Sequence, residues 1–198
     1  PMARRLAHRG WRVVNVEYRR VGEVDDPWPA MAHDVEAAFE VGLAGRDGDP
    51  VVIVGHSAGG QLALWAASLT PHADLAGVAA LAPVADLETA DRLGLSDHAV
   101  RELLGDGPGV RAERIRSVSP VELVPLGVRQ LVVHGHADAN VPLSLSTDYV
   151  AAARAAGDTV TLHDPPDVDH FDIIDPTTDV WAVVETTMAA WVLEESHG

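Results

Sequence analysis

Short apolar runs alternate with longer amphipathic stretches along this chain. The runs are rich in β-branched residues, which is typical of strands. We expect strands at Val13–Val16, Val51–Val54, Val78–Val84, Gln130–Val133 and Thr159–Leu162. Apolar positions recurring every three or four residues predict helices at Trp28–Leu43, Ala58–Leu69, Leu145–Ala156 and Trp181–Leu193.

Strands that alternate with helices indicate parallel strands joined by helical crossovers. The sequence therefore predicts an α/β fold, a three-layer α/β/α sandwich around a mostly parallel, doubly wound sheet. Its 198 residues fit one domain, residues 1–198, with a buried core. Residues 86–125 interrupt the alternation. We expect a helix at Ser96–Leu104, a loop at Gly105–Gly109, and a lid-like insertion over the sheet edge.

Charge and composition exclude several kinds of partner and chemistry. The chain has 30 acidic residues and 14 basic ones, all Arg, for a net charge of −16. Such a surface repels nucleic acids and anionic membranes, and no apolar run approaches the roughly 18 residues of a membrane span. The lack of Cys excludes disulfides, thiolate metal sites and a Cys nucleophile. We expect a cytoplasmic protein that acts on a small molecule without a cofactor, and whose sequence is compatible with a homo-oligomer.

The clearest chemical motif follows the apolar run at residues 51–54. Gly55-His56-Ser57-Ala58-Gly59 lies between a predicted strand and a predicted helix, the context that the G-x-S-x-G nucleophile motif requires. We interpret Ser57 as a nucleophile on a strained turn. Gly55 and Gly59 would be needed because a Cβ there would collide with the neighbouring strand or helix. The Ala58 N–H, at the start of the helix, is the expected oxyanion donor.

A serine nucleophile needs a base that takes its proton and a carboxylate that orients the base. In the fold that carries this motif, the chain order is Ser, acid, His. Asp138 follows the fourth predicted strand and His170 follows the fifth, so both face the carboxyl end of the sheet. They are the candidate acid and base. Other carboxylates that could take the place of the acid are Asp86, Asp164, Asp167, Asp169 and Asp172.

A second pattern, at residues 134–138, belongs to another class of enzyme. His134-x-His136-x-Asp138 resembles the zinc-binding H-x-H-x-D-H string of metallo-β-lactamase-like hydrolases, but Ala139 stands where the last His belongs. A zinc-dependent hydrolase is therefore a remote alternative. We expect a structural role for His134 at the strand end, and a place in solvent or at the mouth of the site for His136. His56 is expected to pack beside the nucleophile.

Several strings together resemble a known group of α/β-hydrolases. They are Gly-His-Ser-Ala-Gly-Gly at residues 55–60, His-Gly-x-x-Asp-x-x-Val-Pro at 134–142 and Asp-His-Phe at 169–171, and the stretch at 6–20 is similar too. The chain resembles small bacterial esterases and arylformamidases of the kynurenine formamidase-like type. This resemblance implies an α/β-hydrolase fold and cleavage of small carboxylic esters or formyl amides by a Ser-His-Asp triad through an acyl-enzyme. Acetyl esterases, formamidases and peptidase-like relatives share these strings, so the substrate stays open.

The sequence departs from that group near its start. The family pattern has a His-Gly-Gly loop that supplies further oxyanion N–H groups, on a strand between those expected at Val13–Val16 and Val51–Val54, and no His-Gly-Gly is present. We therefore expect one of two outcomes. Either the chain is a fragment of a longer protein, so that missing strands leave a gap in the sheet, or the Val13–Val16 strand shifts to pair beside Val51–Val54. A truncated, non-catalytic protein of this fold is the main alternative to an active serine hydrolase.

Overall fold

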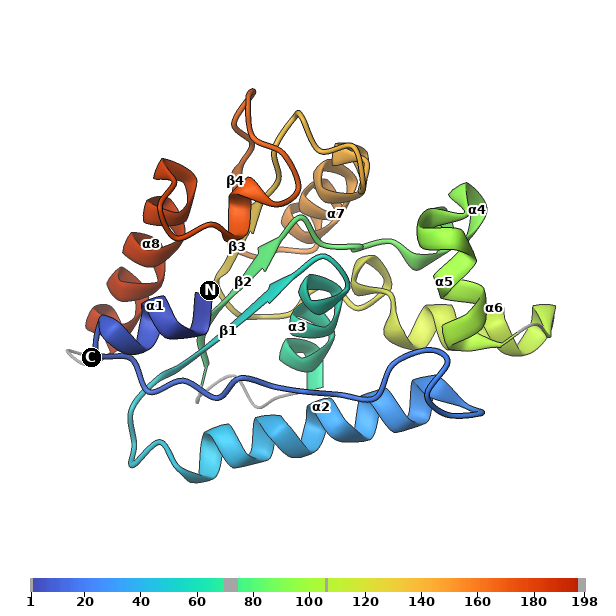
Figure 1. The fold of residues 1–198 in the computed structure, drawn as a ribbon, viewed down its shortest axis with the longest axis horizontal. Coiled ribbons are helices and arrows are strands. Elements are labelled where there is room, and N and C mark those ends of the chain that lie inside the picture. The colour runs from blue at the N-terminus through green and yellow to red at the C-terminus, as the bar shows by residue number, and fades with distance from the viewer. Residues whose placement is uncertain (1, 70–74, 106, 196–198) are drawn as a thin grey trace.

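The computed structural model describes residues 2–69, 75–105 and 107–195, and Figure 1 shows their arrangement. The strands are β1 (Val51–His56), β2 (Leu75–Leu81), β3 (Gln130–Val133) and β4 (Val160–His163). The helices are α1 (Met2–His8), α2 (Pro27–Ala44), α3 (Ala58–Leu69), α4 (Leu87–Leu93), α5 (Leu95–Leu104), α6 (Pro108–Val118), α7 (Leu143–Ala155) and α8 (Asp179–Glu195), with 3₁₀ turns at η2 (Pro120–Glu122) and η3 (Asp172–Ile174). None of the helices in these ranges is long and apolar enough to cross a membrane.

The sheet has the order β1-β2-β3-β4, and each neighbouring pair is parallel. Helix α3 connects β1 to β2, helices α4 to α6 lie between β2 and β3, and α7 connects β3 to β4. The predicted α/β class with a parallel sheet is confirmed. Because the strands run in the same direction, their carboxyl ends lie together at one edge of the sheet, where ligands and reactive groups gather in such folds.

Helices cover both faces of the sheet. Successive side chains of a strand point to opposite faces, so Val78 and Val132 pack in one cluster with residues of α3 and α7. Their neighbours Ala79 and Leu131 pack on the other face with residues of α1 and α8. Strand β2 is buried along its whole length. Figure 1 shows the resulting three layers, with α1 and α8 apart from α3.

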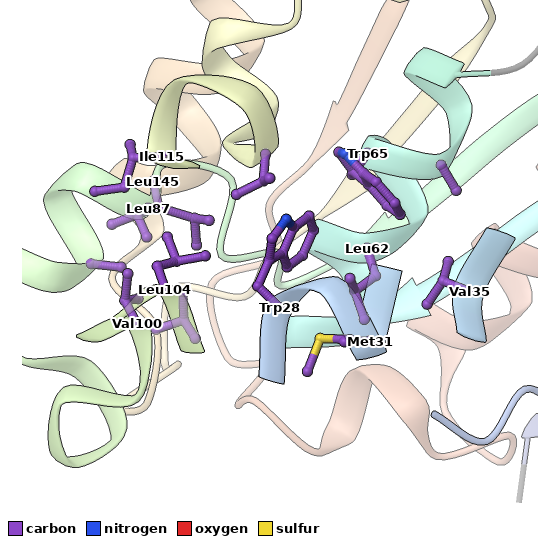
Figure 2. Close-up of a cluster of buried hydrophobic side chains, with 14 residues drawn as sticks. Trp28, Met31, Val35, Leu62, Trp65, Leu87, Val100, Leu104, Ile115 and Leu145 are labelled. Atoms are coloured by element: carbon purple, nitrogen blue, oxygen red, sulfur yellow. The ribbon is translucent and has the colours of Figure 1, made fainter. Parts of the chain in front are cut away.

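Residues 86–125 form a helical lobe beside α2 and α3. The sequence predicts one helix and a loop here, but the chain forms α4, α5 and α6, and α6 begins at Pro108, inside the predicted loop. The rings of Trp28 on α2 and Trp65 on α3 meet edge to face at 5.0 Å. Around them lies one buried apolar cluster (Figure 2) that includes Met31, Leu62, Leu87, Val100, Leu104 and Ile115. The lobe is therefore packed onto α2 and α3, and its action as a lid stays a prediction.

Two of the strand predictions are wrong in detail. Val13–Val16 forms no strand in the described part of the chain. Its β-branched residues favour an extended backbone, but a strand also needs a hydrogen-bonded neighbour, and none lies alongside. Strand β2 ends at Leu81 instead of Val84, because the backbone turns at Ala82, whose φ is +44°. The remaining predicted strands and helices agree with the structure to within about two residues.

The free edge of β1 borders a groove. Strand β1 pairs with β2 alone in the described residues, and a cavity of about 610 Å³ follows its other edge, with a second of about 150 Å³ nearby. Both cavities are lined by Arg12 and Val14 on one side and by Val52 and Val54 of β1 on the other. The segment at Val13–Val16 therefore does not pair with β1, so the expected shift is wrong. A missing strand beside β1 stays a prediction.

Candidate active site

Ser57 occupies the sharp turn between β1 and α3. Its φ of +57° is left-handed, a conformation that is strained for a residue with a Cβ. Its N–H donates to the Leu81 carbonyl at 2.8 Å, and its own carbonyl accepts the N–H groups of Gly60 and Gln61. These bonds to β2 and to the first turn of α3 hold the strained residue at the carboxyl edge of the sheet.

Glycines give this turn its space, although not the pair that the sequence indicates. A Cβ on Gly55 would lie 1.9 Å from the carbonyl oxygen of Gly59, and a Cβ on Gly60 would lie 3.0 Å from Cβ of Pro83. A Cβ on Gly59 would meet nothing within 4 Å. The expectation for Gly55 is confirmed, and that for Gly59 is wrong. Gly59 contributes its backbone to the close approach, while Gly60 is the second position where space is short.

The loops that follow β3 and β4 contact each other at the same edge of the sheet. The Ala137 N–H donates to the Val168 carbonyl at 3.1 Å. A Cβ on Gly135 would lie 1.9 Å from the same carbonyl oxygen, so only glycine allows the two backbones to approach this closely. The contact places Asp138 of the first loop beside His170 of the second.

Asp138 and His170 form a buried pair. His170 Nδ1 lies 2.6 Å from Asp138 Oδ2, and the two side chains are 6% and 0% exposed. The other oxygen, Oδ1, accepts the N–H groups of Asn140 and Val141 at 2.8 and 2.9 Å. A carboxylate in this position holds a proton on Nδ1 of the histidine and leaves Nε2 free to accept one.

The charge of Asp138 is set by two opposing effects. Burial acts to raise the pKa of this carboxyl, but hydrogen bonds from the Val141 N–H, the His170 ring and the Asn140 N–H outweigh it and hold the pKa below its ordinary value. Asp138 is therefore an anion at neutral pH. Its charge can stabilise a positive His170 when that ring takes up a proton.

His56 links the turn at Ser57 to the loop that carries His170. The two imidazole rings lie 4.4 Å apart between centroids, and His56 Nε2 donates to the His170 carbonyl at 2.9 Å. His56 thus packs beside the nucleophile candidate, as expected, and also holds the backbone of His170. In the described residues no hydrogen bond joins the Ser57 hydroxyl to His170. Such bonds are often long before substrate binds.

Free backbone donors lie next to Ser57. The N–H groups of Ala58 and Gly59, the first two residues of α3, make no hydrogen bond in the described part of the chain. They sit at the positive end of the helix dipole, so they can stabilise negative charge on an oxygen bound at Ser57. The groove along β1 is separate from this position, because neither Ser57 nor His170 lines it.

The competing carboxylates have other partners. Asp86 caps α4 by accepting the Thr89 N–H at 3.0 Å, and Asp164 lies 3.3 Å from His136. Asp169 and Asp172 accept backbone N–H groups within their own turn. Of all the carboxylates in the described ranges, Asp138 alone, and so not Asp167, hydrogen-bonds to the His170 ring.

The residues of the zinc-like pattern do not converge on a metal site. Both ring nitrogens of His134 are engaged inside the protein, with Ser146 and Val141, whereas the His136 side chain is 50% exposed. No three His, Asp or Glu side chains of the described residues gather closely enough to hold a metal ion.

The sequence pattern did not predict that His56 and His134 both contact the Asp138–His170 pair. Their position in the sequence could have indicated these contacts, because each histidine lies next to a glycine at the carboxyl end of a strand.

A strained serine between a parallel strand and a helix, with a carboxylate–histidine pair on later loops of the same edge, is the arrangement found in the α/β-hydrolase fold. The sequence bears out this class independently of the coordinates. Residues 35–197 match the model of the prolyl oligopeptidase family, and the chain belongs to that family.

Solved structures share this fold. Esterase B from Lactobacillus rhamnosis is 20% identical with a TM-score of 0.81, over 99% of this chain and 71% of that one. A bifunctional GH43-CE protein of Bacteroides eggerthii is 20% identical with a TM-score of 0.80, over 96% of this chain and 28% of that one. The acylaminoacyl peptidase of Pyrococcus horikoshii is 20% identical with a TM-score of 0.61, over 73% and 24%. At such identities the likeness shows the fold alone.

The space around Gly55 and Gly59 predicts different losses of stability when each is replaced by alanine. Gly55→Ala forces a Cβ against the Gly59 carbonyl and should cost about 3 kcal/mol or more of unfolding free energy. Gly59→Ala meets open space and should change stability by no more than about 1 kcal/mol. Urea unfolding followed by circular dichroism measures both. Equal losses in the two variants would contradict this account of the turn.

The buried imidazoles predict a dependence of stability on pH. Burial is the largest cause that lowers the pKa of His56 and of His134 below the ordinary value of 6.5. The unfolded chain therefore takes up protons before the folded protein does, and their contribution to stability, complete above pH 6.5, is lost as the pH falls. Between pH 7.5 and 5.5 the urea midpoint should fall more in the wild type than in His56→Phe. The same change at the exposed His33 serves as the control and should leave the wild-type slope unaltered. A wild-type midpoint that falls no more than that of His56→Phe would oppose the prediction.

Proposed function

We propose that this protein is a serine hydrolase that cleaves small carboxylic esters or formyl amides through an acyl-enzyme, with Ser57 as nucleophile, His170 as base and Asp138 as the acid that orients it. The observation that carries the proposal is the buried hydrogen bond of 2.6 Å between His170 and Asp138, beside a serine in a left-handed turn. A structural ion pair alone would not require that strained serine at the same edge of the sheet.

The reaction follows from these positions. His170 Nε2 takes the proton of the Ser57 hydroxyl while Oγ bonds to the carbonyl carbon of the substrate. The Ala58 N–H donates to the oxygen that becomes negative, and Asp138 offsets the positive charge on His170. The C–O or C–N bond then breaks, and His170 returns the proton to the alcohol or amine that leaves. Water, deprotonated by the same histidine, then attacks the acyl carbon, and His170 returns that proton to Ser57 Oγ as the acid leaves.

The substrate class is supported by similarity to named proteins. Among the proteins of the same fold are an esterase, a GH43-CE bifunctional protein and one described as a carbohydrate esterase. This chain covers 71% of the esterase and 70% of the carbohydrate esterase, but 24% of the acylaminoacyl peptidase. The strings shared with arylformamidases add formyl amides to the proposal. A small ester or formyl group is also the substrate that needs the fewest binding contacts.

A second candidate is a non-catalytic protein of this fold. It is favoured by the edge of β1 that pairs with no strand in the described residues. It is also favoured by the small number of oxyanion donors, because Ala58 and Gly59 are the free N–H groups found next to Ser57 in that part of the chain. Loss of a single oxyanion donor typically costs roughly 10²–10³-fold in rate. A chain that lacks further donors could retain the pair of Asp138 and His170 without measurable turnover.

The decisive experiment combines p-nitrophenyl acetate hydrolysis with labelling by a fluorophosphonate. Ser57→Ala should abolish labelling and reduce kcat by about 10⁴-fold or more, because it removes the nucleophile. Ser117→Ala, on the exposed side of α6, should behave as the wild type. A formyl anilide assayed beside the acetate ester distinguishes the two substrate classes.

Each other outcome has a definite meaning. A wild-type protein that is folded by circular dichroism but neither labels nor hydrolyses either substrate would favour the non-catalytic candidate. Activity that persists in Ser57→Ala and disappears with a chelator would contradict the serine mechanism and support zinc chemistry.

A further inference from the structure

His134 is a buried histidine that the proposed reaction does not use. It follows β3 directly, and its side chain has no exposed surface. Nδ1 lies 2.7 Å from the hydroxyl of Ser146 on α7, and Nε2 lies 2.9 Å from the Val141 carbonyl. The same Nε2 is 3.3 Å from Asp138 Oδ2, the oxygen that also contacts His170.

These partners define the protonation of the ring. The Val141 carbonyl and the Asp138 carboxylate can only accept hydrogen bonds, so the hydrogen of His134 lies on Nε2. The Ser146 hydroxyl can donate, and in a neutral ring it donates to Nδ1. Burial, the largest effect, lowers the pKa of His134, which agrees with a neutral ring at pH 7.

The position of His134 matters for Asp138 in two ways. It holds the loop that carries the carboxylate, because Val141 accepts from His134 through its carbonyl and donates to Asp138 through its N–H. It also puts a second imidazole on the oxygen that must stabilise a positive His170. Two positive rings on one carboxylate would repel each other, so His170 can act as the base only while His134 stays neutral.

We propose that His134 is a positioning residue, a neutral Nε2–H tautomer whose Nδ1 accepts from Ser146, and that it fixes the loop and the Oδ2 atom of Asp138 beneath His170. The relay then has four members, Ser146, His134, Asp138 and His170, of which His170 alone takes up a proton during the reaction. The titratable groups that face this cluster are Asp138, His170 and His56. The measurement of kcat rests on the proposed function, whereas the imidazole spectra do not.

Three variants and the wild type test it. His134→Leu removes the ring nitrogens and should lower kcat about 10-fold with KM within about twofold, the size expected when one hydrogen bond near a charge is lost. His134→Gln keeps an N–H donor toward Val141 and Asp138 and should restore most of that loss. His136→Gln is the matched control, because His136 lies on the same loop with an exposed side chain that contacts Asp164, and it should match the wild type.

A measurement without turnover separates this proposal from the proposed function. Imidazole ¹⁵N–¹H spectra of the wild type should show His134 as the Nε2–H tautomer at pH 7. In His134→Leu the signal of the His170 Nδ1 proton should move, because the Nε2–H of His134 no longer competes for Asp138 Oδ2. Ser146→Ala keeps the ring and both acceptors of Nε2–H but removes the hydrogen bond to Nδ1 that favours the neutral ring. The pKa of His134 should therefore rise in this variant, which gives a test if His134→Leu fails to fold.

Several results would overturn the proposal. They are an Nδ1–H or protonated His134 in the wild type at pH 7, an unchanged His170 Nδ1–H signal and kcat in a folded His134→Leu, or an equal loss in His136→Gln. Absence of turnover in every variant, with the predicted spectra, would count against the hydrolase alone.

Discussion

Contact between backbones without room for a Cβ is the constraint on which this site depends. The carbonyl of Gly59 comes so near the α-carbon of Gly55 that a methyl group there would overlap it. This approach lets α3 follow β1 with one residue, Ser57, between them, and it leaves Ser57 in a conformation that few non-glycine residues adopt. Hydrogen bonds to β2 and to the first turn of α3 hold Ser57 in this strained conformation. The sheet and the helix, and not a flexible loop, therefore fix its geometry.

The same constraint acts a second time on the far side of the site. Gly135 lets the loop after β3 touch the loop after β4 at Val168, and only then can Asp138 reach His170. His56 completes the arrangement from the first turn, because its ring lies on His170 and its Nε2 donates to the carbonyl of that residue. Three segments far apart in sequence are thereby locked to one another at a single edge of the sheet.

The sequence predicted those features that depend on local pattern or on chain order. The run at residues 51–54, the elbow at Ser57 and the placement of Asp138 and His170 after successive strands needed no knowledge of packing. The Val13–Val16 strand failed because a strand is a property of two segments, and the pattern of one does not reveal whether a neighbour exists. The role of Gly60 and the contacts of His134 were missed for a related reason, since both depend on side chains and backbone brought in from elsewhere, Pro83 in one case and Ser146 in the other.

The free edge of β1 has a consequence for how the protein behaves in solution. Within the described residues, the outer side of β1 pairs with no strand and carries the apolar Val52 and Val54. Such an edge is a template onto which an extended segment of another molecule can add. Against this stands a net charge of −16, which keeps copies of the chain apart over distances comparable to the Debye length, about 8 Å at physiological ionic strength. Charge repulsion between copies of the chain therefore opposes this pairing. Added salt, or a pH near the isoelectric point of about 4.8, weakens the repulsion and lets the free edge of β1 meet another copy of the chain.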